Sequence, residues 1–375
     1  MLKKENLMPK ALETILEIDL SALTHNFQYL KSKLQPNTKF LAVVKAFAYG
    51  SDSVEVAKHL QKLKVDYFAV AYTKEGVLLR EAGITAPILV LHPQSINFKT
   101  LIDKCLEPSL YSSYVLNEFI KVSEAQSQTN YPVHIKFNTG LNRLGFEQND
   151  VDYIVSRLND TSSIVAKSLF SHLAASEDAS ASNFTSQQIE NFKTIALKFE
   201  TKIGYRPWLH LCNTSGVLNY TEAHLDMVRC GIGLYGFGNS TNEDKNLKPI
   251  ASLRSVISQI HNIKKDETVG YGRAYKAKDF EKTATIPIGH ADGINRIYGN
   301  GNGFVIINGK KAPIIGNVCM DMIMVNITDI NCKEGDEVIV FDNNNKASNL
   351  AESANTISYE IITSISQRVQ RLFLK

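Results

Sequence analysis

The first two-thirds of the chain alternates short apolar runs with stretches of helical periodicity, and this alternation limits the folds that the chain can adopt. The apolar runs have the length and composition of buried strands, and they lie at 14–19, 40–45, 67–71, 87–92, 132–137, 166–172, 208–212 and 225–231. The stretches between them place apolar residues on one face of a helix, for example over 183–200. Repeated strand-then-helix units specify parallel strands joined by crossover helices. Eight such units favour a closed (β/α)8 barrel over an open doubly wound sheet.

The pattern changes near residue 250, where apolar runs follow one another without helices between them. Asn308 and Gly309 separate two of these runs, and this pair is the strongest short-range signal of a β-hairpin. The chain is therefore expected to be an α/β protein, with an N-terminal (β/α)8 barrel over residues 1–248 and a mainly β C-terminal domain over residues 249–375. The boundary is expected in the lysine- and asparagine-rich stretch 242–249.

Composition restricts the possible partners. The 375 residues carry a net charge of +3, from 41 basic and 38 acidic side chains, which gives no reason to expect binding to nucleic acid or to a membrane surface. The N-terminus lacks the uninterrupted apolar core of a signal peptide, and no apolar run approaches the ~20 residues of a membrane helix. The five cysteines show neither close pairing nor a metal-binding spacing. These features predict a cytoplasmic enzyme or binding protein without a metal.

Polar residues that end the apolar runs are the candidates for chemistry, because barrel active sites lie at the carboxyl ends of the strands. Lys45 ends the run 40–45. A lysine desolvated at this position would have a lowered pKa and suit Schiff-base chemistry, while a lysine reaching from a strand end into solvent is the ordinary alternative. Tyr49 follows four residues later, just before Gly50, and could help to bind a phosphate.

Two further candidates follow the next strands along the chain. Arg143 lies in a polar, glycine-containing loop, where an arginine can clamp a carboxylate with two hydrogen bonds, or simply point into water. His172 ends the run 166–172, where an imidazole can stack or form hydrogen bonds. A structural core histidine is an equally good interpretation of His172.

The later strands end in small polar residues and glycines. Thr214 lies in a polar segment before a predicted helix, where helix N–H groups can hold a phosphate. Arg229 precedes a glycine-rich stretch at a late strand–loop junction, where barrels commonly bind phosphate. In the β domain, Tyr271 lies between two glycines, and turn geometry explains the glycines but not the tyrosine.

Taken together and in order, these stretches closely resemble the alanine racemase family, enzymes that combine a barrel with a β domain and use pyridoxal phosphate. The resemblance begins at EIDLSALTHNF (17–27) and ends at SYEIITSISQRVQR (358–371), so it covers nearly the whole chain. One such motif is weak evidence, whereas eight in the right order are strong evidence.

The resemblance implies pyridoxal 5'-phosphate as cofactor, an amino acid as substrate and a homodimer with shared active sites. The implied reaction is the interconversion of L- and D-alanine by two bases, which supplies D-alanine for peptidoglycan; a role in alanine catabolism is the alternative. Lys45 is implied to bind the cofactor covalently and to be the base on the D face of the substrate. Tyr271, from the partner subunit, is implied to be the base on the L face.

The resemblance also assigns contacts to substrate and cofactor. Arg143 and the partner's Met320 are implied to bind the substrate, and Arg143 also the phenolic oxygen of the cofactor. Arg229 is implied to bind the pyridine nitrogen, with His172 behind it. An arginine there disfavours protonation of the ring, which would suppress transamination and decarboxylation. The candidates for binding the phosphate are Tyr49, Thr214, Gly231, Ile232 and Tyr359.

Some positions depart from the family pattern or carry a variable feature. Lys136 matches a lysine that is carbamylated in some members, although a free lysine is the simpler expectation. The departures are Phe47 in place of asparagine, Ser51 and Asp52 in place of histidine and glycine, Asn138 in place of aspartate, and His290 in place of a tyrosine at the substrate entrance.

Three other functions are compatible with parts of the sequence. A racemase of broad specificity has the same chemistry and differs only in its pocket. A pyridoxal-phosphate decarboxylase usually pairs the pyridine nitrogen with an acidic residue, so Arg229 argues against it. A non-catalytic cofactor carrier would resemble the barrel alone, and the β domain with Tyr271 and Met320 argues against that.

Overall fold

The computed structural model describes residues 13–375, which divide into two compact units. One unit consists of residues 23–248, and the other combines the described residues up to Ala22 with residues 249–375. Within the described part of the chain, no helix has both the length and the apolar character needed to cross a membrane.

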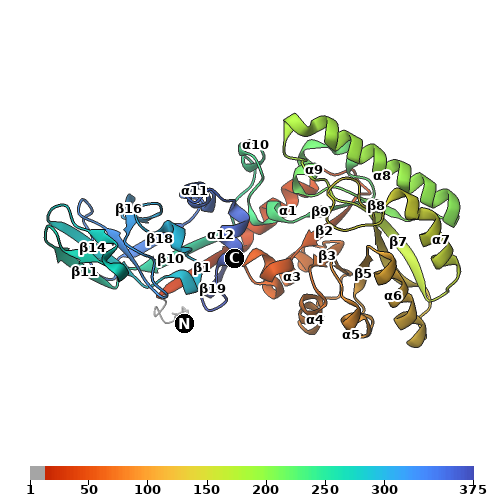
Figure 1. Cartoon of the computed structure of the whole chain (residues 1–375), viewed down its shortest axis with the longest axis horizontal. Helices are drawn as coiled ribbons and strands as arrows, with labels where there is room; N and C mark the ends of the chain where they lie inside the picture. Colours follow the sequence, from red (N-terminus) through yellow and green to blue (C-terminus); the bar gives the residue numbers. More distant parts are fainter. Residues whose placement is uncertain (1–12) are drawn as a thin grey trace, which may run out of the picture. The chain divides into compact units, whose positions relative to one another are not determined.

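The unit of residues 23–248 is a closed barrel of parallel strands with helices around it, as predicted (Figure 1). It closes where the first barrel strand pairs in parallel with the last. The strands are β2 (Lys39–Val43), β3 (Tyr67–Val70), β4 (Ile88–Val90), β5 (Glu107–Leu110), β6 (Tyr131–Lys136), β7 (Ile164–Phe170), β8 (Trp208–His210) and β9 (Met227–Cys230). The helices that begin in or belong to this part of the chain are α1 (Leu20–Lys31), α3 (Ser53–Lys62), α4 (Thr73–Glu81), α5 (Phe98–Asp103), α6 (Ser113–Ala125), α7 (Val151–Asn159), α8 (Ser182–Ile203), α9 (Thr214–Asn219) and α10 (Thr241–Asp244).

The number of barrel strands was predicted correctly, but one predicted strand does not belong to the barrel and one barrel strand was missed. The run 14–19 is a strand, β1 (Thr14–Asp19), but it pairs with strands of the other unit and not with the barrel. Conversely, β5 is a barrel strand that the hydrophobic pattern missed, because its sequence EPSL contains glutamate, proline and serine. All four of its residues are buried, and Glu107 points into a polar network inside the barrel.

The second unit is built around a nine-stranded sheet with the order β11-β14-β17-β16-β15-β18-β10-β1-β19 (Figure 1). Asn308 and Gly309, with φ of 48° and 77°, turn the chain between β15 and β16, so the predicted hairpin is confirmed. The strands are β10 (Ala251–Val256), β11 (Gln259–Ile263), β12 (Thr268–Val269), β13 (Tyr275–Lys276), β14 (Glu281–Ile286), β15 (Phe304–Ile307), β16 (Lys310–Ile315), β17 (Ile323–Asn326), β18 (Glu337–Phe341) and β19 (Gln370–Leu374), with helices α11 (Ala347–Ser353) and α12 (Ser358–Ser364).

Candidate active site

The structure divides the predicted site residues between the two units. Those of the β unit are Tyr271, Met320 and Tyr359. The others lie in the barrel unit, on or just after the carboxyl ends of strands, and they are Lys45, Tyr49, Lys136, Arg143, His172, Thr214, Arg229, Gly231 and Ile232. Because all barrel strands are parallel, these nine residues share one face of the barrel, the face that carries active sites in this fold.

A left-handed turn, α2 (Lys45–Tyr49), follows β2 directly. The four residues Ala46 to Tyr49 have φ between 50° and 56°, a region that costs a residue with a side chain about 1–2 kcal/mol. Phe47 occupies this turn, whereas the family's usual asparagine tolerates the conformation better. Such a strained conformation persists only where the neighbouring structure holds it in place. The turn therefore fixes the backbone positions of Lys45 and Tyr49 relative to each other.

Glu75 is the residue that anchors this turn, and the sequence analysis missed it. Its carboxylate accepts hydrogen bonds from the backbone N–H groups of Ala46 at 2.7 Å, Ala71 at 2.7 Å and Tyr72 at 3.1 Å. It thereby ties the turn after β2 to the start of α4. The sequence around Glu75 could have indicated this role, because a glutamate in the first turn of a helix commonly accepts hydrogen bonds from the backbone just before the helix.

The residues after β9 come very close to Tyr49. A Cβ atom on Gly231 would lie 2.3 Å from the Tyr49 hydroxyl, so only glycine fits at this position. Tyr49 is buried and stacks on Tyr235 at 4.4 Å, and the Tyr235 hydroxyl donates to the Val43 carbonyl at 2.9 Å. The hydroxyl of Tyr49 is therefore held rigidly beside the glycine backbone.

Two helical turns begin next to this contact. Thr214 is the first residue of α9, and its hydroxyl accepts a hydrogen bond from the N–H of Gly233 at 3.3 Å. Ile232 begins a short 3-10 turn after β9. The first N–H groups of a helix have no partner inside it, so Thr214 and Ile232 each bring backbone donors that suit an anion.

Arg229 is the most completely buried cation of the barrel face, at 4% exposure. Its Nη1 lies 2.9 Å from Nδ1 of His210, and its Nη2 lies 3.1 Å from Nδ1 of His172. Nη2 also donates to the carbonyls of Ser171 at 2.7 Å and Leu211 at 3.0 Å. The predicted Arg229–His172 pair is present, and His210 is a further partner that the sequence did not indicate.

The loop that carries Arg143 is organised by Asn138, at the position where aspartate is common. The Asn138 carbonyl oxygen accepts from the N–H groups of Gly140 and Asn142 at 3.1 and 3.0 Å. Its amide group donates to Glu147 at 2.9 Å, which an aspartate could not do. Asn138 thus orders the loop through its own hydrogen bonds, and Arg143 in this loop is exposed.

The barrel face concentrates positive charge. Burial lowers the pKa of Lys45, and the charge of Arg143 lowers it further, while Glu75 acts in the opposite sense. Burial together with Arg143, Arg229 and Lys45 lowers the pKa of Lys136 to about 8. Burial and the same surrounding cations lower the pKa of His172 far below its ordinary value, so this imidazole is neutral at pH 7.

This arrangement fits an anionic cofactor with an aldehyde. A lysine with a lowered pKa supplies the neutral amine that a Schiff base requires. The cations around it favour a ligand that bears a phosphate and a phenolate, and the Tyr49–Gly231 contact with the helix starts at Thr214 and Ile232 offers a place for the phosphate.

Tyr271 lies in a tight loop of the β unit. Gly270 and Gly272 on either side of it have φ of 77° and 67°, and the Tyr271 carbonyl accepts from the Asn317 side chain at 3.0 Å. The ring itself is 75% exposed. The two glycines thus form the turn that projects the tyrosine away from its own unit.

Met320 belongs to a second loop, which is held against the turn at His290. The N–H groups of His290 and Ala291 donate to the carbonyls of Cys319 at 2.9 Å and Met320 at 3.0 Å. A Cβ atom on Gly289 would lie 2.3 Å from the Met320 carbonyl oxygen, so this close approach requires glycine. The backbone of Met320 is fixed, whereas its side chain is 59% exposed.

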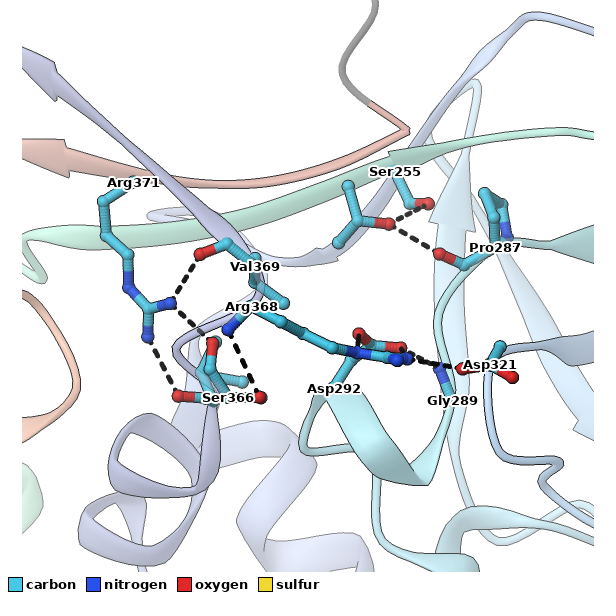
Figure 2. Close-up of polar contacts among 11 residues, drawn as sticks. Ser255, Pro287, Gly289, Asp292, Asp321, Ser366, Arg368, Val369 and Arg371 are labelled. Atoms are coloured by element: carbon cyan, nitrogen blue, oxygen red, sulfur yellow. Dashed lines mark hydrogen bonds and ion pairs between the residues drawn. The ribbon is translucent and has the colours of Figure 1, made fainter.

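Arg368 joins these two loops, and sequence analysis did not single it out. Figure 2 shows its guanidinium between two carboxylates. It donates to both oxygens of Asp292 at 2.7 and 3.0 Å, and to Asp321 at 2.7 Å. Asp292 also accepts from the N–H of Gly289 at 2.8 Å. Arg368 therefore positions the Met320 loop and the His290 turn together.

Tyr359 is the second residue of α12 in the β unit and is partly buried. Its carbonyl accepts from the Thr363 hydroxyl at 2.6 Å, within the same helix. Its proposed phosphate partners, Tyr49, Thr214, Gly231 and Ile232, belong to the other unit, so the assignment of Tyr359 stays a prediction.

Comparison with known proteins identifies the family. The model described as alanine racemase, N-terminal domain, matches residues 18–238, and that described as alanine racemase, C-terminal domain, matches residues 250–373. An alanine racemase from Halothermothrix orenii is 36% identical over 363 residues, which are 95% of this chain and 95% of that protein. One from Methanococcus maripaludis is 34% identical over 369 residues, covering 96% and 98%.

Solved structures agree. An alanine racemase from Clostridium difficile 630 superposes with a TM-score of 0.91 at 35% identity, covering 97% of this chain and 96% of that one. One from Bartonella henselae with covalently bound pyridoxal phosphate gives a TM-score of 0.86 at 28% identity, covering 96% and 99%. The chain belongs to the alanine racemase family, whose members are pyridoxal-phosphate-dependent isomerases.

Proposed function

We propose that this chain interconverts L- and D-alanine with two bases, Lys45 on the D face and Tyr271 on the L face, and supplies D-alanine for peptidoglycan in the cytoplasm. The observation that carries the proposal is the concentration of positive charge around Lys45, from Arg143, Lys136 and Arg229, because it provides both a reactive amine and a site for an anionic cofactor. The bound cofactor would supply an electron sink for the pair of electrons left at Cα.

Lys45 has the properties required of the first base. Its lowered pKa increases the share of neutral Nζ, the form that can bind the cofactor carbonyl and later remove a proton from Cα. The left-handed turn and Glu75 fix its backbone, which limits the directions from which Nζ can approach. Arg143 supplies the cation for the substrate carboxylate, and its loop is ordered by Asn138.

Arg229 would face the pyridine nitrogen. Because guanidinium hydrogens are donors only, the ring nitrogen opposite them would accept and stay unprotonated. His172 and His210 behind Arg229 both have pKa values far below the ordinary one through burial, so they present neutral acceptors to it. This arrangement would favour reprotonation at Cα over proton transfer to the cofactor, which suits racemisation.

Tyr271 is the second base in this proposal, and it would act in the active site of a partner subunit. Tyr271 is exposed in its own unit. The side chain of Met320 is also exposed, whereas its backbone is held by hydrogen bonds. In a homodimer, the loops of each copy could lie against the barrel of the other copy. That barrel would then surround the side chains of Tyr271 and Met320. The proton would move between Cα and the phenolic oxygen of Tyr271.

The test of the proposal combines cofactor binding with isotope exchange. Purified protein should absorb near the visible edge when pyridoxal phosphate is bound, and L-alanine in deuterated water should yield D-alanine with deuterium at Cα. An absorbance band without racemisation would contradict the proposed reaction and point to another amino acid or to decarboxylation. Failure to bind added cofactor would contradict the proposal altogether.

The Tyr271→Phe variant tests the assignment of the two faces. Loss of the phenolic oxygen should slow single-turnover exchange from L-alanine by about 10²–10⁴-fold, and from D-alanine far less, because Lys45 remains. Tyr275→Phe in the same unit is a matched control, since its hydroxyl donates to Glu281 within the fold. Equal losses from both enantiomers in Tyr271→Phe would contradict the assignment.

A further inference from the structure

The interior of the barrel contains a chain of polar side chains that the proposed reaction does not use. It begins at Arg229 on the catalytic face and continues through four buried residues of neighbouring strands: His210, Ser168, His134 and Glu107. Ser168, His134 and His210 have no exposed surface, and Glu107 is 7% exposed. A buried polar chain of this length is retained only where every member finds a partner.

Each contact in the chain is short. Nη1 of Arg229 lies 2.9 Å from Nδ1 of His210, and Nε2 of His210 lies 2.8 Å from the Ser168 hydroxyl. That hydroxyl lies 2.6 Å from Nδ1 of His134, and Nε2 of His134 lies 2.7 Å from Oε2 of Glu107. Both nitrogens of both imidazoles are thus engaged.

The two ends fix the direction of every hydrogen bond between them. Arg229 can only donate, so Nδ1 of His210 must accept. Burial alone would raise the pKa of Glu107, but the hydrogen bonds from His134 and Lys167 and the charge of Lys167 lower it, so the carboxylate is ionised and can only accept. One arrangement then uses every proton: Arg229 donates to His210, His210 to Ser168, Ser168 to His134, and His134 to Glu107.

We propose that Glu107 is a positioning residue for Arg229: through His134 and Ser168 it holds His210 as the Nε2–H tautomer, which presents an acceptor to the guanidinium. The role in catalysis rests on the proposed function, whereas the tautomers are a property of the barrel itself. If the chain ran in the opposite direction, Nδ1–H of His210 would face Nη1–H of Arg229. Two opposed donors would displace the guanidinium from the position that keeps the pyridine nitrogen unprotonated.

The surroundings of Glu107 indicate how to reverse the chain. Its Oε1 accepts from Nζ of Lys167 at 3.0 Å, and its Oε2 accepts from the Tyr67 hydroxyl at 2.8 Å in addition to His134. In Glu107→Gln, the ammonium of Lys167 requires the amide oxygen on its own side, so the amide N–H groups turn towards His134. His134 must then accept at Nε2 and donate at Nδ1, and His210 is driven to the Nδ1–H tautomer.

Two further variants complete the design. Glu107→Gln combined with Lys167→Met removes the ammonium that orients the amide, so the glutamine oxygen can accept from His134 and the original direction returns. Glu81→Gln is the matched control, because Glu81 and Lys104 form a comparable 3.0 Å pair on the surface, away from the chain.

The decisive measurement is ¹⁵N NMR of the imidazole nitrogens in protein with labelled histidine, with and without pyridoxal phosphate, assigned with His134→Gln and His210→Gln variants. We expect His134 and His210 to be neutral Nε2–H tautomers in the wild-type protein and in Glu81→Gln. In Glu107→Gln, His210 should change to Nδ1–H, and in the double variant it should change back. The loaded Glu107→Gln enzyme should also release pyruvate by abortive transamination at least several-fold more often per racemisation.

The outcomes separate this inference from the proposed function. Wild-type tautomers other than Nε2–H, or an unchanged His210 in Glu107→Gln, overturn the inference even if the enzyme racemises alanine. The predicted tautomers in a protein that does not racemise alanine support the chain and contradict the function. If Glu107→Gln does not fold, Arg229→Met replaces it: without the guanidinium, the chain from Glu107 should still hold His210 as the Nε2–H tautomer, and a mixture of tautomers would overturn the inference.

Discussion

In the barrel unit Arg229 is surrounded by two histidines and two carbonyls, whereas in the β unit Tyr271 is held through its backbone carbonyl and its ring is exposed. The barrel therefore supplies both the functional group and its environment. The β unit supplies a rigid loop and leaves the environment of the side chain to be provided by another surface. Sites of the first kind are preorganised by one chain, and those of the second kind depend on assembly.

The largest expected loss of activity comes from removing the amine of Lys45 in the barrel unit. Lys45→Ala should abolish racemisation, by more than about 10⁴-fold, because both covalent binding of the cofactor and one base are lost. The absorbance of lysine-bound cofactor should disappear with it. Lys39→Ala is a control on the same strand, since Lys39 packs over Trp208 at 4.8 Å. An unchanged absorbance band in Lys45→Ala would contradict the role of Lys45.

A smaller effect should follow from loosening the rigid loops of the β unit. Arg368→Lys keeps the charge but cannot bind both oxygens of Asp292 and reach Asp321, so the Met320 loop should lose its fixed position. Misplacement of this kind should lower kcat/KM by about 10-fold to 10²-fold. Arg254→Lys is the control, because Arg254 also bridges two carboxylates, those of Glu17 and Glu337. Equal rates for the two variants would contradict a role of Arg368 in positioning the loop.

Lys136 offers a test of the positive charge that is concentrated on the barrel face. The charges that act on it, Arg143, Arg229 and Lys45, are all positive, so a carbamate at Nζ would replace repulsion by attraction. Neutral amine is the form that reacts with CO₂, and its fraction grows as pH rises through the pKa of Lys136, about 8. Although the sequence alone favours a free lysine, the surrounding cations favour the carbamate, so we expect a ¹³C carbamate signal from labelled CO₂ that increases over this range and is absent in Lys136→Arg. A spectrum without this signal at pH 9 would show that the lysine stays free.

The smallest effect concerns Asp52, which stands where glycine is usual. Its φ of 108° is strained for a residue with a side chain, by about 1–3 kcal/mol, but its carboxylate caps α3 by accepting from Val54 and Glu55. Asp52→Gly should therefore be neutral or stabilising, by up to about 2 kcal/mol. Asp52→Ala loses the cap and keeps the strain, so it should destabilise by about 1 kcal/mol. Urea unfolding measures both, and the reverse order of stability would contradict this explanation of Asp52.

The sequence predicted the barrel because seven of its eight strands are continuous apolar runs. It missed β5 because the buried Glu107 of that strand is satisfied by Tyr67 and His134 of neighbouring strands, which no local pattern reveals. It assigned β1 to the barrel because a strand's pattern does not identify its partners. Site residues after strands were predictable from position and family motifs, whereas Glu75, His210 and Arg368 act through contacts distant in sequence.

The central proposal is a shared active site, which combines the barrel unit of one chain with the Tyr271 and Met320 loops of another. Co-expression of Lys45→Ala and Tyr271→Phe chains with different affinity tags allows the mixed dimer to be purified. In that dimer one site would carry both substitutions, and the other would be intact. We predict about half of the wild-type racemisation rate, although each variant alone is inactive or severely impaired. A mixed dimer with no more activity than its parents would contradict the shared site.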